Sequence, residues 1–177
     1  VAGSRSSVLL SRETPLFIQG PLGQLEALLL EVPDARGVAL LCHPNPVQGG
    51  TMLNKVVSTL QRTARDCSYH TLRFNYRGVG ASAGSHDMGT GEVDDAEAVA
   101  VWLRDKYPSL PITLLGFSFG GFVAAALGAR LEAQGQVPSK LFMVAPAVHR
   151  LTAETPPASQ CPLVVIQPDA DEVIEAQ

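Results

Sequence analysis

The sequence predicts an α/β domain built on a mostly parallel, twisted β-sheet with helices on both faces and an antiparallel hairpin at its amino-terminal end. Short apolar runs such as residues 38–42 alternate along the chain with longer segments in which apolar residues recur at helical spacing. Such alternation is typical of strand–helix–strand units, whose strands lie parallel in one sheet. A glycine-bearing turn, residues 20–23, separates the first two strands and predicts the hairpin.

The first half of the chain divides into a hairpin, a buried strand, a helix and another strand. We expect these elements at residues 16–19 and 25–32, 38–42, 53–66, and 70–75. The run at 38–42 is apolar throughout, which is typical of a strand buried on both faces. The helix is indicated by apolar residues at positions 53, 56, 57 and 60.

The second half contains two helices and three strands. We expect a helix at 92–106, a strand at 111–115, a helix at 121–127, and strands at 141–145 and 163–167. Acidic residues in the first turn of the 92–106 helix complement its dipole, and Pro108 ends it.

Composition narrows the class of protein. The 177 residues suffice for one domain, which we place at 14–177 after an N-terminal extension at 1–13. A net charge of −4 without a basic stripe argues against nucleic acid as a partner, and the longest apolar runs are far too short to span a membrane. The three cysteines, at 42, 67 and 161, show no disulfide or zinc spacing, so we expect core thiols, no metal and a cytoplasmic location.

The most informative motif is G-x-S-x-G at Gly116 to Gly120, which lies between a predicted strand and a predicted helix. In that setting it predicts a nucleophile elbow, a strained turn that presents the hydroxyl of Ser118 at the sheet edge. The backbone N–H of Phe119 would then help to stabilise an oxyanion. The alternative is a glycine-rich strand end that carries an ordinary surface serine.

A second oxyanion donor is expected in the loop after an earlier strand, and residues 43–50 fit that position. Proline has no N–H, so Pro44 and Pro46 cannot donate and Asn45 is the candidate. The same loop could also be an ordinary connector. His43, at the strand end, is interpreted as a structural residue that fixes the loop, with a catalytic base as the alternative.

The third candidate is an acid in the turn after the strand at 163–167. The chain order Ser, Asp, His favours a carboxylate there, and we choose Asp171 over Asp169, with a solvated acidic turn as the alternative. His149 as base would violate that order. The glycine-rich turn at Arg77 lacks a phosphate-loop pattern and is interpreted as structural.

Together these motifs resemble the α/β-hydrolase superfamily, and more closely a branch of small, cap-less, bacterial-type hydrolases distantly similar to dienelactone hydrolase. The matching stretches are H-P-x-P-x-x-G-G-T-M at 43–52, L-R-F-N-Y-R-G-V-G at 72–80, D-M-G-T-G-E at 87–92, the 116–120 motif, and D-A-D-E-V at 169–173. The resemblance implies Ser118 as nucleophile, Asp171 as triad acid, and Asn45 with Phe119 as oxyanion donors. It departs at Pro168, where such proteins usually have glycine.

The resemblance also implies a histidine after one more helix and strand, and none follows His149. We therefore expect further chain beyond Gln177; the alternative is a complete but catalytically inactive chain. The expected function is a carboxylesterase-like serine hydrolase that cleaves a small ester or related acyl substrate without a cofactor. A lactone or acyl-peptide hydrolase and a non-catalytic binding protein of the same fold are the alternatives. The oligomeric state is left open.

Overall fold

A computed structural model describes residues 12–150 and 160–169. Its strands form one seven-stranded sheet in the order β1-β2-β4-β3-β5-β6-β7. The strands are β1 (Thr14–Gly20), β2 (Gly23–Leu30), β3 (Gly37–Cys42), β4 (Tyr69–Phe74), β5 (Ile112–Phe117), β6 (Lys140–Val144) and β7 (Leu163–Ile166). The first two strands form the predicted antiparallel hairpin, and β4, β3, β5, β6 and β7 run parallel to one another. The predicted α/β class is thus confirmed.

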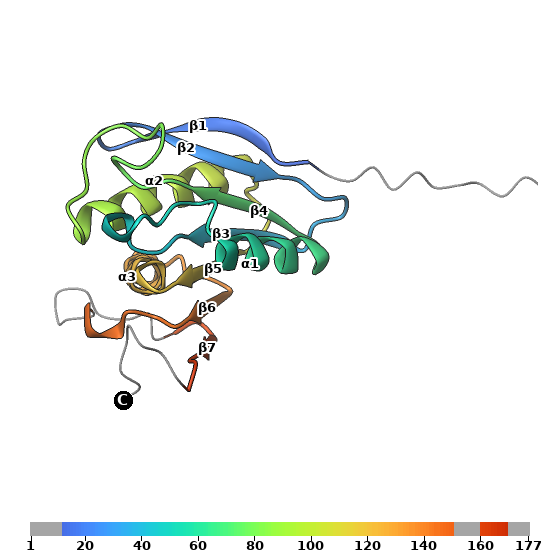
Figure 1. Ribbon diagram of the computed structural model, residues 1–177. Helices are drawn as coiled ribbons and strands as arrows, with labels where there is room; N and C mark the ends of the chain where they lie inside the picture. The colour runs from blue at the N-terminus through green and yellow to red at the C-terminus, as the bar shows by residue number, and fades with distance from the viewer. Residues whose placement is uncertain (1–11, 151–159, 170–177) are drawn as a thin grey trace, which may run out of the picture.

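Helices cover both faces of this sheet. They are α1 (Lys55–Asp66), α2 (Thr90–Lys106) and α3 (Phe119–Ala133), with short 3₁₀ turns at Pro46–Gln48 and Val148–Arg150. Successive residues of a strand point to opposite faces. Along β3, Val38, Leu40 and Cys42 join the larger core under α2 and α3, whereas Ala39 and Leu41 pack with Val57 of α1. Figure 1 shows α1 beside β3 and β4, and α3 beside β5 and β6.

The strands and the helix starts lie within two residues of their predicted positions, but α3 continues to Ala133, six residues past its predicted end at 127. Helix α1 begins at Lys55 because the side chain of Asn54 accepts the N–H groups of Val56 and Val57, which leaves Leu53 outside and exposed. Helix α3 begins at Phe119, directly after Ser118, and not at Gly121.

The cysteines confirm the prediction of core thiols only in part. Cys42 and Cys161 are buried, but Cys67 is exposed because it caps the carboxyl end of α1. All three are free thiols. Burial raises the pKa of Cys42 to about 12, so this thiol is chemically inert at neutral pH.

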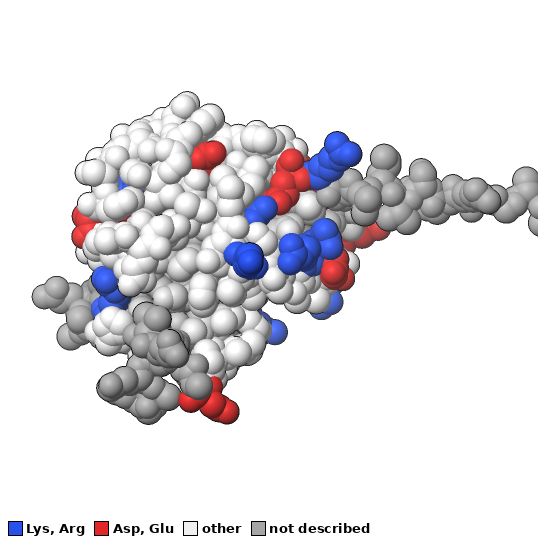
Figure 2. All heavy atoms as spheres, in the orientation of Figure 1, with Lys and Arg blue, Asp and Glu red and all other residues white. Residues whose placement is uncertain are grey.

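Acidic and basic side chains are interspersed on the face drawn in Figure 2, so this face carries no continuous patch of one sign. Within residues 12–150 and 160–169, no helix is both long and apolar enough to cross a membrane.

Candidate active site

The topology places a switch point at the carboxyl ends of β3 and β5. From β3 the chain passes through α1 to β4 on one side, and from β5 it passes through α3 to β6 on the other side. The two connections therefore diverge from neighbouring strands, and their helices lie on opposite faces of the sheet. Ligands bind at such a switch point in open α/β sheets. Cys42 pairs with Gly116 in the register, so the loop at His43 and the turn at Ser118 leave the sheet side by side.

Ser118 forms the turn between β5 and α3 in a backbone conformation that side chains rarely adopt. Its φ is 55° and its ψ is −119°. Such a residue costs of order 1–3 kcal/mol and persists only where the surrounding structure holds it in place. Here its N–H donates to the Val144 carbonyl at 3.0 Å, and its own carbonyl accepts from Gly121 and Ala147. The hydroxyl is half-buried and makes no hydrogen bond to another described residue.

The two glycines of the motif are required by close backbone contacts. A Cβ on Gly116 would lie 2.1 Å from the carbonyl oxygen of Gly120. A Cβ on Gly120 would lie 2.1 Å from the carbonyl oxygen of Cys42 and 2.7 Å from that of His43. Real Cβ atoms do not approach this closely, so the missing side chains allow α3 to start directly against the end of β3.

The loop that follows β3 satisfies almost all of its own backbone groups. The N–H of Val47 donates to the Asn45 side chain, those of Gln48 and Gly50 donate to the Asn45 carbonyl, and that of Gly49 donates to the Pro46 carbonyl. The N–H of Asn45 is the exception in residues 45–50, because no described residue accepts it. At the start of α3, the N–H of Phe119 likewise has no acceptor in the described part of the chain. The two predicted oxyanion donors are therefore both available amides at the same sheet edge.

His43 is completely buried behind this loop. Its Nδ1 lies 2.8 Å from the Pro44 carbonyl oxygen, and its Nε2 accepts the backbone N–H of Tyr76 at 3.3 Å. The Tyr76 hydroxyl donates to the His43 carbonyl at 2.8 Å, and the two rings are stacked with centroids 4.0 Å apart. Burial lowers the pKa of His43 from its ordinary 6.5 to about 3, so the ring is neutral. Both ring nitrogens are engaged, which agrees with a loop-fixing residue and argues against a catalytic base.

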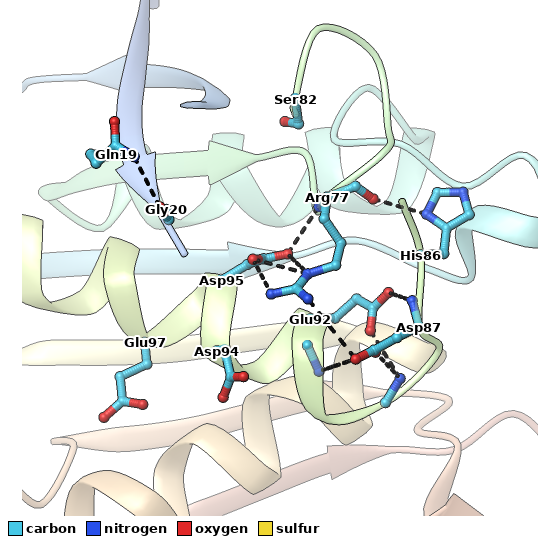
Figure 3. Close-up of polar contacts among 12 residues, drawn as sticks. Gln19, Gly20, Arg77, Ser82, His86, Asp87, Glu92, Asp94, Asp95 and Glu97 are labelled. Carbon is cyan, nitrogen blue, oxygen red and sulfur yellow. Dashed lines mark hydrogen bonds and ion pairs between the residues drawn. The ribbon is translucent and has the colours of Figure 1, made fainter. Parts of the chain in front are cut away.

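A buried ion pair holds the turn after β4, as Figure 3 shows. The guanidinium of Arg77 contacts both carboxylate oxygens of Asp95 on α2, and the Arg77 backbone N–H donates to the same carboxylate at 2.9 Å. His86 contacts the Arg77 carbonyl at 2.9 Å. These contacts agree with the structural interpretation of Arg77.

The loop before α2 is fixed by Glu92. Its carboxylate accepts the N–H groups of Asp87, Met88 and Gly89, and Asp87 in turn accepts the N–H of Gly91. Burial and the neighbouring Asp87 raise the pKa of Glu92, whereas the hydrogen bond with Glu92 lowers the pKa of Asp87. The acidic first turn was predicted to complement the helix dipole, and Glu92 does so by binding three backbone amides.

Arg150 contacts Phe119, and the motifs did not indicate it. Arg150 donates to the Met88 carbonyl at 3.0 Å, and its guanidinium carbon lies 5.0 Å from the ring centroid of Phe119. A cation therefore lies against the first residue of α3. No local pattern marks Arg150, because its partners are distant along the chain.

The predicted acid lies outside the described residues, so the position of Asp171 is not compared. Asp169 is exposed beyond the end of β7. None of the described histidines is hydrogen-bonded to Ser118. His70 lies at the amino-terminal end of β4, away from the carboxyl ends of the strands, and His149 is exposed in the turn after β6. The same part of the chain contains no cluster of three or more His, Cys, Asp or Glu side chains arranged to hold a metal ion.

Comparison with known proteins identifies relatives for most of the chain. A family model described as alpha/beta hydrolase fold matches residues 40–159. An α/β serine hydrolase without a lid from Xanthomonas campestris is 40% identical, with a TM-score of 0.81 over 93% of this chain and 74% of that one. An α/β serine hydrolase homologue from Coxiella burnetii is 38% identical, with a TM-score of 0.81 over 90% of this chain and 76% of that one. An uncharacterised Rickettsia prowazekii protein is 32% identical over 91% of this chain and 68% of its own length.

Proposed function

Because the chain belongs to the alpha/beta hydrolase family, we propose that it is a carboxylesterase-like serine hydrolase that forms an acyl-enzyme at Ser118. The observation that carries this proposal is the strained backbone of Ser118, at φ 55°, between two glycines that tolerate no side chain. A hydroxyl held in this way at a switch point of the sheet supports a role for Ser118 in attack on a bound carbonyl.

In the proposed reaction, the Ser118 oxygen attacks the ester carbonyl while its proton passes to a histidine. The N–H groups of Asn45 and Phe119 bind the resulting oxyanion. The histidine then returns the proton to the leaving alkoxide, and water hydrolyses the acyl-enzyme by the same two steps. By the superfamily order Ser, Asp, His, we assign Asp171 as the acid that orients this histidine.

The proposed substrate is a small ester or related acyl compound that enters from solvent. Between Ala145, directly after β6, and Cys161 the chain has only residues 146–160. This segment is too short for a separate lid domain. The similar Xanthomonas protein is described as having no lid. No cofactor is required by this chemistry. The free thiols are compatible with the reducing cytoplasm, where we place the protein.

The test is labelling of the full-length gene product with a fluorophosphonate, which reacts with activated serines. We expect one labelled peptide, which contains Ser118, and no labelling of Ser118→Ala. Ser85→Ala is the matched control, because this serine is exposed in a loop and should not change labelling. An unlabelled wild-type protein would refute the hydrolase and favour a non-catalytic binding protein. A panel of short esters, lactones and acyl-peptides then distinguishes the substrate classes.

A further inference from the structure

The ring of His43 is held in one tautomer by its neighbours. The backbone N–H of Tyr76 is always a donor, so the Nε2 atom that it contacts at 3.3 Å must be the unprotonated nitrogen. The proton of the neutral ring therefore lies on Nδ1. That nitrogen is 2.8 Å from the Pro44 carbonyl oxygen, to which it donates.

The carbonyl of Pro44 belongs to the same planar peptide group as the N–H of Asn45. In a trans peptide the C=O and the N–H point in opposite directions, and no peptide bond among the described residues is cis. A hydrogen bond that fixes the direction of the Pro44 carbonyl therefore fixes the direction of the Asn45 N–H as well. His43 thus acts on the proposed oxyanion donor without touching the substrate.

The remaining contacts of this peptide come from the loop itself. A Cβ on Gly50 would lie 2.3 Å from the Pro44 oxygen and 2.6 Å from the Asn45 oxygen, so the absence of a side chain there leaves room for the carbonyl. The Asn45 carbonyl and side chain are occupied by the N–H groups of Gln48, Gly50 and Val47. These contacts hold the carbonyl and the side chain of Asn45. His43, in contrast, contacts the peptide group between Pro44 and Asn45, through the Pro44 carbonyl.

We propose that His43 is a positioning residue that aims the Asn45 N–H at the oxyanion by donating its Nδ1 proton to the Pro44 carbonyl. The inference rests on the proposed function, because it assigns Asn45 as an oxyanion donor. Tyr76 supports this arrangement through three contacts. Its N–H selects the tautomer of His43, its hydroxyl donates to the His43 carbonyl, and its ring packs against the imidazole.

Two substitutions separate the contacts of the two ring nitrogens. In His43→Asn, the side-chain amide reaches the position of Nδ1 and can still donate to the Pro44 carbonyl. In His43→Gln, the longer amide reaches the position of Nε2 and can accept from Tyr76, but the donor to Pro44 is lost. His70→Gln is a matched control. His70 also accepts a backbone N–H on one ring nitrogen and packs against a tyrosine ring, but it lies at the amino-terminal end of β4, at the other end of the parallel strands.

The experiment measures kcat and KM for a short p-nitrophenyl ester with the full-length protein, together with the ¹H–¹⁵N resonance of the Asn45 amide. His43→Gln should lower kcat by about 10- to 100-fold, below the loss for complete removal of an oxyanion donor, with KM within about threefold. The Asn45 resonance should move. His43→Asn should restore kcat to within about threefold, and His70→Gln should leave kcat and the resonance in place.

The positioning role is overturned if His43→Gln retains the wild-type kcat, or if His43→Asn loses as much as His43→Gln. If His43→Gln does not fold, Gly50→Ala replaces it, since its Cβ would displace the same carbonyl; an unchanged Asn45 resonance there contradicts the inference. If the wild-type protein turns over no ester and reacts with no fluorophosphonate, the proposed function fails. The Asn45 resonance in the three variants still decides whether His43 orients the peptide.

Discussion

Acidification from pH 7 to pH 5 should destabilise the protein through His43. The folded protein protonates this ring only near pH 3, whereas the unfolded chain protonates it near 6.5, because burial lowers the folded-state pKa. Between these values the unfolded state binds more protons, so stability is complete above about 6.5 and falls as the pH falls toward 3. In this range each pH unit changes the free energy of unfolding by about 1.4 kcal/mol. The interval from the unfolded-state pKa of 6.5 down to pH 5 therefore amounts to about 2 kcal/mol.

Urea unfolding at pH 7 and pH 5 measures this loss, with His43→Asn as the reference protein. The variant keeps a donor to the Pro44 carbonyl but has no titratable group at position 43. His86 and His70 are present in both proteins, so their contributions cancel in the comparison. The wild-type protein should lose about 2 kcal/mol more than the variant between the two pH values. Equal losses in the two proteins would refute the assignment of a buried, neutral His43.

Three further substitutions test the surroundings of the site. Asp95→Ala leaves the buried Arg77 guanidinium with only the Asp87 carboxylate, 4.0 Å away, and should lower the free energy of unfolding in urea by about 3–5 kcal/mol, so a loss below about 1 kcal/mol would contradict the role of the pair. Gly120→Ala places a Cβ 2.1 Å from the Cys42 carbonyl oxygen and should lower the thermal midpoint by about 5–10 °C, whereas an unchanged midpoint would show that the contact relaxes freely. Ser118→Gly relieves the strain at φ 55° and should raise the free energy of unfolding by about 1 kcal/mol while abolishing fluorophosphonate labelling; a less stable variant would argue against stored strain.

The order and type of the elements could be predicted because apolar periodicity is a local property of the sequence. The fully buried β3 was recognised from an unbroken apolar run, and the hairpin from its glycine-bearing turn. Helix starts differ from the predicted positions by two residues, as some strand ends do, because capping is decided by side-chain geometry. Asn54 moves the start of α1 past Leu53, and Glu92 begins its capping contacts from inside α2.

The sequence indicates candidate site residues where they belong to a short local motif. Ser118 and the N–H of Phe119 follow from the glycine spacing, and Asn45 follows from the two prolines that cannot donate. The pairing of Arg77 with Asp95, 18 positions apart, and the double contact of Tyr76 with His43 depend on the strand order and could not be predicted from spacing. The contact of Arg150 with Phe119 depends on the path of the chain after β6 for the same reason.

The choice of residue at position 118 itself favours catalysis over a purely structural turn. A backbone at φ 55° and ψ −119° is accessible to glycine without the strain that a side chain adds. The neighbouring positions 116 and 120 do carry glycine, because any Cβ there would meet backbone atoms at 2.1 Å. A structural turn would therefore be served best by a third glycine. Serine adds strain and one hydroxyl, and this hydroxyl has no partner among the described residues. This choice of residue supports the proposed role of Ser118 as a nucleophile.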